Sequence, residues 1–186
     1  MGDRLLRLLR ERAHRAGEVR LSSGRRSTFF IDCKRVVLMA EGHALVGEAL
    51  RRELAALDPA PSAVAGVELG GCPLASAVAC CSAGTERPYD AVYVRKKAKE
   101  HGSRRELEGA DHLPPGARVV VLEDVVTTGA STLRAIERLR AHGLDVVHVA
   151  ALVDREEGGA AAIRGAGVTF SALYSRADFT GEGERG

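Results

Sequence analysis

The sequence predicts an α/β fold, in which helices flank a mainly parallel, twisted sheet and a small N-terminal hood precedes it. From residue 63 onward, short apolar runs rich in β-branched residues alternate with helical patterns across mostly short connections. The run Val119–Leu122 is apolar throughout, which is typical of a strand buried on both faces of a parallel sheet. Parallel strands place their carboxyl ends on one edge, and ligands of such sheets bind beyond that edge. Functional residues are therefore expected there.

The chain length fits one domain. With 186 residues, the protein can bury one substantial core but not two. We expect a single domain over residues 1–180, made of an N-terminal helix and hood hairpin (1–38) and an α/β core (39–175). Residues 181–186 are rich in glycine and charge, and we expect this tail to be disordered.

Composition excludes several classes of function. The 27 basic residues are interleaved with 25 acidic ones, so the net charge of +2 forms no tract suited to nucleic acid. No apolar run approaches the roughly 18 residues of a membrane span. The four cysteines include no Cys-x-x-Cys pair, which argues against a zinc site or a disulfide framework. We expect a cytoplasmic protein that binds neither nucleic acid nor membrane, with Cys80 and Cys81 as small core residues of an apolar helix.

The first third of the chain is expected to form a helix, a hairpin and a second helix. Leucine and alanine recur on one face up to Ala16, and Gly17 follows as a helix end. Two short strands, 19–21 and 28–33, flank a turn rich in serine and glycine, which indicates a hairpin. Leucine periodicity then predicts a long helix over 39–57, stopped by the following Asp-Pro.

The remaining elements alternate between strand and helix. Strands are expected at 63–67, 89–95, 118–122, 145–153 and 167–173, and helices at 73–83, 130–142 and 157–165. Four loops should converge on the carboxyl edge of the sheet, namely 68–71, 95–99, 123–129 and 154–155.

The loop after strand 118–122 has the character of an anion-binding turn. Glu123 and Asp124 come first, followed by small hydroxyl residues and a glycine before a helix begins. The N–H groups of Thr127–Ser131 lack partners within such a helix, and the helix dipole favours an anion there. A phosphate is the expected guest, while the two acids suit a ligand that also carries hydroxyls or a hard cation. The alternative is that Thr128 or Ser131 only caps the helix and that the acids are solvated.

A long polar segment follows strand 89–95. It shows no helix or strand periodicity up to Glu108, and Arg95–Gly102 holds four cations and a histidine. One interpretation is a solvated surface run. The other is a mobile lid that closes over a polyanion and places cations at a developing negative charge, with glycines at 102 and 109 as hinges.

Together these segments resemble the type I phosphoribosyltransferases and, within them, the orotate phosphoribosyltransferases. The motif Glu123-Asp124-Val-Val-Thr-Thr-Gly129 resembles the binding motif for phosphoribosyl pyrophosphate that the whole superfamily shares. Further segments narrow the match, in chain order: Ser23-Gly24-Arg25-x-Ser27 with Phe29-Phe30-Ile31-Asp32, Gly66-Val-Glu-Leu-Gly-Gly-x-Pro-Leu74, Arg95-Lys96-x-x-Lys99-x-His101-Gly102 and Asp154-Arg155-x-Glu157-Gly158-Gly159. The resemblance covers nearly the whole globular part of the chain.

The resemblance implies the type I phosphoribosyltransferase fold and a specific reaction. Orotate and phosphoribosyl pyrophosphate would give orotidine 5′-monophosphate and pyrophosphate, a step in pyrimidine (UMP) synthesis. Mg²⁺ would be carried by the substrate, with Asp124 as the one candidate for a direct ligand. A homodimer with shared active sites is also implied, because in this family the lid reaches into the neighbouring subunit's site.

The resemblance also implies the residues that do the work. Catalysis would use Glu123, Asp124, Lys99 and His101, with Lys99 or His101 as the proton donor to the leaving group. Orotate would be held by Arg25, Phe29, Phe30, Thr127 and Arg155. Phosphoribosyl pyrophosphate would be bound by Glu68, Leu69, Gly70, Arg95, Lys96, Lys99, His101, Glu123, Asp124, Val125, Val126, Thr127, Thr128, Gly129, Ala130 and Ser131.

Two departures from the family pattern leave alternatives open. Some members carry a lysine in the turn 68–71, but this chain has none, so pyrophosphate there must rely on backbone groups. Ser22 stands where some members have another lysine, and Arg25, Arg26 and Lys34 are the candidates to replace it. The alternative functions are a phosphoribosyltransferase for another base and a non-catalytic regulator that binds phosphoribosyl pyrophosphate.

Overall fold

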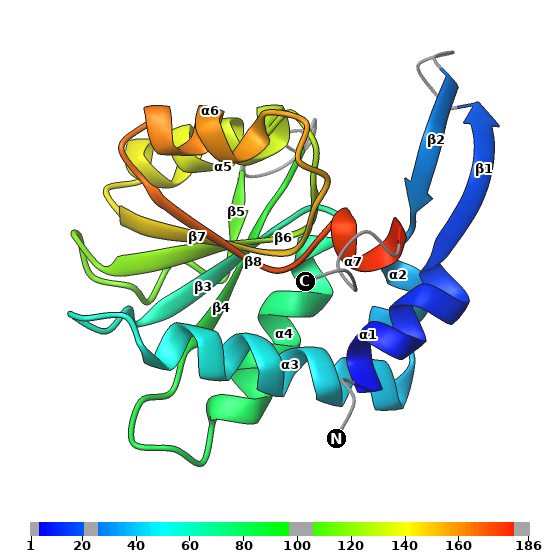
Figure 1. The fold of residues 1–186 in the computed structure, drawn as a ribbon. Coiled ribbons are helices and arrows are strands. Elements are labelled where there is room, and N and C mark those ends of the chain that lie inside the picture. Colours follow the sequence, from blue (N-terminus) through cyan, green and yellow to red (C-terminus); the bar gives the residue numbers. More distant parts are fainter. Residues whose placement is uncertain (1–3, 21–25, 97–105, 181–186) are drawn as a thin grey trace, which may run out of the picture.

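The structure, a computed structural model, describes residues 4–20, 26–96 and 106–180 (Figure 1). Within these ranges, the side chains of residues 16–20 and 26–28 are not described. The expected tail 181–186 lies outside the described residues. None of the helices in the described ranges has the length and apolar character needed to cross a bilayer.

A six-stranded sheet forms the centre of the molecule. Its strands run in the order β5-β4-β3-β6-β7-β8, and all neighbouring pairs are parallel except β4 with β5. This arrangement confirms the predicted α/β fold with a mainly parallel sheet. The strands are β3 (Ala63–Val67), β4 (Asp90–Val94), β5 (Leu107–Glu108), β6 (Arg118–Val126), β7 (Asp145–Asp154) and β8 (Thr169–Ser175).

Helices cover both faces of this sheet (Figure 1). One face carries α3 (Ala40–Ala55) and α4 (Gly71–Ser82), and the other carries α5 (Ala130–Ala141) and α6 (Gly159–Gly165). The alternation of side chains along β6 explains why both faces are apolar. Val120 and Leu122 pack into the cluster with α3 and α4, whereas Val119 and Val121 pack into the cluster with α5 and α6.

The N-terminal part forms the predicted hairpin, but its first helix is shorter than expected. Helix α1 (Arg4–Leu8) continues into a wider π-helical turn, η1 (Leu9–Ala13), and strand β1 (His14–Arg20) begins at once. The prediction that the helix includes Ala16 and ends at Gly17 was wrong. Ala16 instead pairs with Phe29 of β2 (Arg26–Ile31), so hairpin pairing outweighs the local helical pattern.

The hairpin β1–β2 is a separate two-stranded sheet beside the main one (Figure 1). Short helix α2 (Lys34–Val37) follows it, and α7 (Ala177–Thr180) comes at the end of the described chain. Buried Leu9 and Ala13 join the cluster that also contains Leu50 and Leu54 of α3. The hood is thus packed against the α3 side of the core.

Two smaller predictions also changed. Strand β6 continues to Val126 rather than ending at residue 122, so the two acids lie within the last part of the strand. Cys80 is exposed and Cys81 is only half-buried, so their prediction as core residues was wrong. The inner face of α4 is formed instead by residues such as Leu74 and Val78.

Candidate active site

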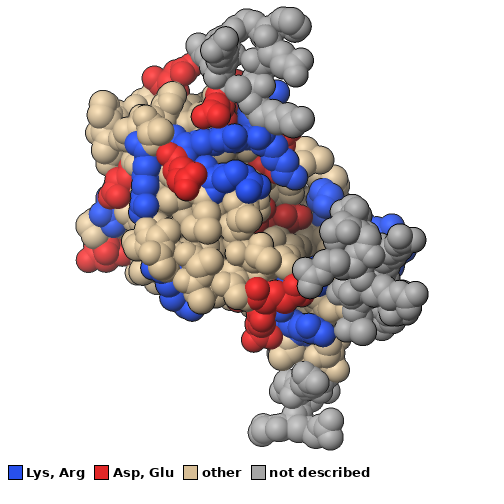
Figure 2. All heavy atoms as spheres, turned by 90° about the horizontal axis from the view of Figure 1, so that it is seen from above, with Lys and Arg blue, Asp and Glu red and all other residues tan. Residues whose placement is uncertain are grey.

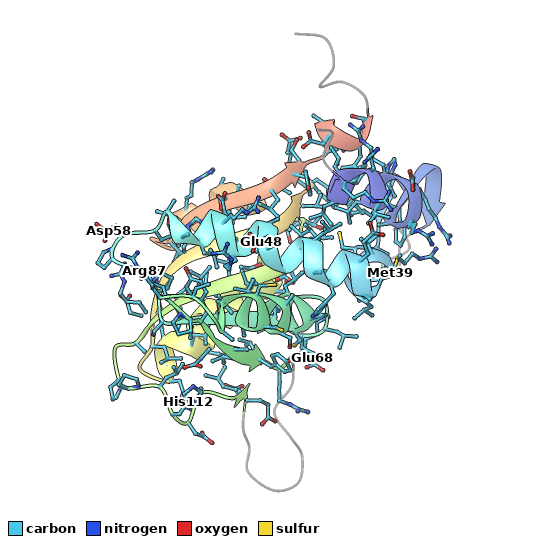
Figure 3. All side chains as sticks on the ribbon, turned by 90° about the horizontal axis from the view of Figure 1, so that it is seen from below. Met39, Glu48, Asp58, Glu68, Arg87 and His112 are labelled. Carbon is cyan, nitrogen blue, oxygen red and sulfur yellow. The ribbon has the colours of Figure 1, made fainter. Side chains whose placement is uncertain are left out.

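The predicted loops converge at the carboxyl edge of the sheet. The Lys96 N–H, just after β4, donates to the Glu68 carboxylate that follows β3, at 2.7 Å. On the other side of β6, the Arg155 N–H donates to the carbonyl of Val126 at 2.9 Å. Figure 3 labels Glu68 at this edge, close to the start of α4. The rim predicted from strand order therefore exists.

The turn that opens helix α5 is shaped by glycines. Gly129 precedes the helix with φ of 78°, a left-handed conformation that glycine adopts without strain, and no side chain caps the helix start. Gly159 supports the turn from behind, because its N–H donates to the Thr127 carbonyl at 3.0 Å. A β-carbon on Gly159 would lie 2.4 Å from Cγ1 of Val126 and 2.7 Å from that carbonyl oxygen. The backbone of the turn is held in place and has no room for a larger residue behind it.

Two hydroxyls in the first turn of α5 donate hydrogen bonds to a carboxylate and do not cap the helix. Ser131 Oγ and Thr132 Oγ1 donate to Oε2 of Glu123, at 3.2 and 3.0 Å. Gly129, and not Thr128, occupies the N-cap position, and the Ser131 hydroxyl bonds Glu123, so the alternative in which either side chain caps α5 is wrong. The first N–H groups of the helix lack acceptors within it and are available to an anion.

Glu123 is an unusually buried acid, with 6% of its surface exposed. Burial, and secondarily the charge of Asp124, raises its pKa to about 7, although the two hydroxyls act in the opposite direction. A carboxyl in this state can hold or release a proton near neutral pH. The expectation of a simply solvated acid is not met.

Asp124 lies between a lysine and a glycine. Burial raises the pKa of Asp124, and the charge of Lys34 opposes that effect. The Lys34 Nζ lies 3.8 Å from Asp124 Oδ2 and 2.7 Å from Asp32 Oδ1. Of the three candidates for the missing cation near Ser22, Lys34 thus reaches the site. The side chains of Arg25 and Arg26 lie outside the described ones.

The turn after β3 approaches Asp124 through backbone alone. A β-carbon on Gly70 would lie 2.1 Å from Cγ of Asp124, and one on Gly71 would lie 2.3 Å from the carbonyl oxygen of Leu122. The peptide bond between Glu68 and Leu69 is cis, and the Leu69 side chain is 63% exposed. A side chain at Gly70 or Gly71 would collide with the Asp124 side chain or with the Leu122 backbone.

The segment expected to be a lid is described only at its two ends. The N–H of Arg95 donates to the Glu106 carbonyl at 2.9 Å, and Nη1 of Arg95 lies 3.2 Å from Oε1 of Glu108. Lys99 and His101 lie outside the described residues. Figure 2 shows basic side chains spread across the face that carries α5 and α6, where Arg134 and Arg138 lie in α5.

The other end of the site is built around Phe29. This ring is 1% exposed, and the guanidinium carbons of Arg155 and Arg176 lie 5.6 and 5.5 Å from its centre. The ring of Phe179 meets it edge-on at 5.9 Å, and Arg155 also pairs with Glu157 at 2.6 Å. Phe29 therefore packs behind the site, whereas Phe30 is partly exposed.

Some residues at the site were not singled out from the sequence. Arg176 belongs to this set, as do Thr132 in its bond to Glu123 and Arg138 beside the lid ends. Their roles depend on tertiary contacts, so no local pattern could have indicated them. Within the described ranges, no group of three or more His, Cys, Asp or Glu side chains is arranged to hold a metal ion.

Comparison with known proteins gives a consistent result. A family model described as "Phosphoribosyl transferase domain" matches residues 41–173. An orotate phosphoribosyltransferase of Sorangium cellulosum is 59% identical over 95% of this chain and 92% of its own length. One from a Synechocystis species is 47% identical over 94% of this chain and 86% of its own.

Solved structures agree with these relatives. The orotate phosphoribosyltransferase of Mycobacterium tuberculosis H37Rv, in complex with Fe(III) dicitrate, has a TM-score of 0.81 at 38% identity, covering 96% of this chain and 98% of that one. The same enzyme in complex with 5-phospho-α-D-ribosyl 1-diphosphate has a TM-score of 0.77 at 34% identity, covering 95% and 97%.

Proposed function

This chain belongs to the phosphoribosyltransferase family, and from that premise we propose that it acts as an orotate phosphoribosyltransferase. It transfers the phosphoribosyl group of phosphoribosyl pyrophosphate to orotate in pyrimidine synthesis. One observation supports this most directly: two adjacent acids, Glu123 and Asp124, lie between an anion-binding helix start and a turn that presents backbone alone. The helix start, the two acids and the turn match, in that order, a phosphate, a ribose and a pyrophosphate.

The helix start holds the 5′-phosphate. Backbone N–H groups of Thr127–Ser131 point outward at the positive end of α5, where an anion is favoured. The side chain of Thr127 is half-buried and that of Thr128 is exposed, so their hydroxyls can add hydrogen-bond donors. Val125, Val126 and Ala130 contribute through the shape of the backbone.

The acids serve the ribose. Bond formation between a ring nitrogen of orotate and the anomeric carbon accompanies cleavage of the bond from that carbon to pyrophosphate. The sugar becomes cationic in between, so carboxylates beside it stabilise the transition state more than the ground state. We assign this role, and the contacts to the ribose hydroxyls, to Asp124. Glu123, with its pKa near 7, can accept a hydrogen bond or donate one.

The leaving pyrophosphate is received by cations and by backbone. Arg95 and Lys96 lie at the end of β4, next to the turn formed by Glu68, Leu69 and Gly70. We assign proton donation to the leaving oxygen to Lys99 or His101, as the motif implies. Because the family's lid acts in the neighbouring site, the active form is proposed to be a homodimer.

Orotate is placed at the Phe29 end. Its carboxylate suits the Arg155 guanidinium, which has the fork of donors that carboxylates prefer. Backbone groups near Phe29 and Phe30, the Thr127 hydroxyl beneath the ring and Arg25 complete the proposed contacts. The Phe29 ring itself packs against the Arg155 guanidinium and supports its position.

Mg²⁺ fits this site as a companion of the substrate. Carboxylate oxygens are the ligands that Mg²⁺ prefers, and Asp124 keeps part of its carboxyl accessible, with 14% of its side chain exposed. When bound, the ion supplies neutralisation of pyrophosphate charge.

All four cysteines are free, which suits the reducing cytoplasm as the proposed location.

The assay that tests the proposal uses purified protein with phosphoribosyl pyrophosphate, Mg²⁺ and one base at a time. Loss of orotate absorbance together with pyrophosphate release is expected. Turnover with uracil or a purine, but not with orotate, would show a phosphoribosyltransferase for another base. Binding of phosphoribosyl pyrophosphate without turnover of any base would show a regulator.

A further inference from the structure

We propose that Arg138 is a positioning residue for the pyrophosphate end of the site. It acts through the backbone of Arg95 and Lys96, two of the cations assigned above to pyrophosphate. The inference rests on the proposed function, which supplies the role of those two cations. It adds a residue from the last turn of helix α5, outside the motifs that identify the family.

The guanidinium of Arg138 contacts both ends of the segment between β4 and β5. Its Nη1 donates to the carbonyl of Arg95, and its Nη2 donates to the carbonyl of Lys96 at 3.2 Å. Its Nε lies 3.3 Å from Oε1 of Glu106, directly before β5. The Arg138 side chain is 22% exposed, so these interactions are partly shielded from water.

The backbone of Lys96 is consequently held from both sides. Its carbonyl accepts from Arg138, and its N–H donates to the Glu68 carboxylate at 2.7 Å. Fixing both peptide units sets the direction in which the Lys96 side chain leaves the chain. Glu68 belongs to the turn that faces the pyrophosphate, so this anchoring ties the cations to the same turn.

An arginine is suited to this task in a way that a lysine is not. The guanidinium is planar and carries five donors in a rigid fork, so one side chain can orient two successive carbonyls and a carboxylate. An ammonium is a point charge that cannot reproduce this arrangement. The contacts therefore predict that geometry, beyond charge, is what Arg138 provides.

Helix α5 connects the Arg138 contacts to the proposed 5′-phosphate turn. The helix begins at Ala130, beside the proposed 5′-phosphate turn, and Arg138 lies eight residues later, roughly 12 Å along the axis at the usual rise per residue. One rigid element therefore carries the phosphate turn at its start and the anchor of the pyrophosphate cations further on. It fixes the separation between the two anion-binding ends of the site.

The test compares Arg138→Met, Arg138→Lys and Arg140→Met. Arg140 is the matched control, because it lies on the same helix and also donates to a backbone carbonyl, that of Ala166 at 3.1 Å. Calorimetry with Mg²⁺ would measure the Kd of pyrophosphate and, separately, that of ribose 5-phosphate. The second ligand reports on the phosphate turn without involving the pyrophosphate end.

For Arg138→Met we expect a 10- to 100-fold weaker binding of pyrophosphate, with ribose 5-phosphate within twofold of the unmodified protein. Arg138→Lys should remain at least fivefold weaker for pyrophosphate, and Arg140→Met should bind both ligands normally. Unchanged pyrophosphate binding in Arg138→Met would overturn the proposal. So would equal losses for both ligands, which would indicate general damage to α5, or full rescue by lysine, which would reduce the role to charge.

Binding measurements keep this inference separate from the proposed function. If the unmodified protein binds pyrophosphate but does not turn over orotate, the function fails and the Arg138 comparison can still be made. If orotate turns over normally and Arg138→Met leaves pyrophosphate binding and kcat/KM unchanged, only the positioning role fails.

Discussion

Gly70 lies directly against the carboxylate of Asp124, so close that a β-carbon on Gly70 would come within 2.1 Å of Cγ. The turn after β3 and the acid at the end of β6 are thus fitted to each other through a missing side chain. Glycine at this position is a steric requirement of the site rather than a matter of backbone flexibility, because its φ is not in the left-handed range.

Gly70→Ala should therefore damage activity by moving Asp124 or the turn. We expect kcat/KM for phosphoribosyl pyrophosphate to fall at least tenfold, and the free energy of unfolding to drop by about 1–3 kcal/mol, as is usual for overpacking. Gly165→Ala is the control, since a β-carbon there meets nothing within 4 Å. Steady-state kinetics and thermal unfolding check both. A Gly70→Ala enzyme with normal kinetics would contradict the fit.

Glu123 should lower stability at high pH. Its pKa is raised to about 7 in the folded state, so the folded protein binds this proton more tightly than the unfolded chain, where the value is near 4.5. The contribution of Glu123 to the free energy of unfolding is thus fully present below about pH 4.5. It is lost as the pH rises through 7, which lowers that free energy by an amount on the order of 3 kcal/mol.

Glu123→Gln avoids this cost, because glutamine carries no charge. We expect the variant to lose most of its turnover but to have a higher Tm than the unmodified protein at pH 8, with the difference shrinking toward pH 5. Thermal unfolding without ligands, across that range, measures it. A Tm difference that does not change with pH would argue against a buried, charged Glu123.

Lys34 should matter for substrate binding, because its Nζ lies between the carboxylates of Asp32 and Asp124. Lys34→Met leaves these acids without their shared cation, and we expect KM for phosphoribosyl pyrophosphate to rise about tenfold. Arg35→Met is the comparison, since Arg35 pairs with Asp32 at 3.8 Å but, among the described residues, forms no ion pair with Asp124. Equal kinetics for the two variants would remove Lys34 from the site.

Arg155 should decide between orotate and uracil, which lacks the carboxylate. In Arg155→Met we expect kcat/KM for orotate to fall about 100-fold, while any turnover of uracil changes little, because a charge-assisted pair is lost only with orotate. Arg164→Met is the control, as Arg164 stacks on Phe170 at the same 5.6 Å that separates Arg155 from Phe29. Parallel losses for both bases would speak against carboxylate recognition.

Lys99→Ala should separate binding from chemistry. If Lys99 acts on the leaving group, kcat falls by two orders of magnitude or so while the Kd of phosphoribosyl pyrophosphate changes little. Single-turnover kinetics together with calorimetry would show this split. A near-normal kcat would transfer the role of proton donor to His101.

The fold was predictable because its signals are local and repeated. Apolar runs such as those of β3 and β6 need no tertiary information, and parallel strands bring their carboxyl ends together whatever the details of the helices. The first helix was harder, since its alanine pattern competes with pairing between Ala16 and Phe29, a contact across the hairpin. Cys80 shows the same limit, because an apolar helix does not reveal which face it buries.

The site was predictable where chemistry and chain order coincide, as at Glu123–Gly129. It was not predictable where partners come from distant parts of the chain. Lys34 and Asp124 are 90 positions apart, and Arg138 meets carbonyls some 40 positions earlier. Such pairs, and the burial that raises the pKa of Glu123, exist only in the folded molecule.

The separation of the hairpin β1–β2 from the six-stranded sheet has an evolutionary consequence. The hairpin carries Phe29 and Phe30, whereas the phosphate turn and the two acids belong to the larger sheet, and no strand hydrogen bonds join the two in the described residues. The proposed base contacts therefore come from two units, Phe29 and Phe30 from the hairpin and Arg155 from the end of β7, so changes in the hairpin can adjust base preference without altering the phosphate turn. A base without a carboxylate would also require a change at Arg155, on the larger sheet, so the two units would have to change together.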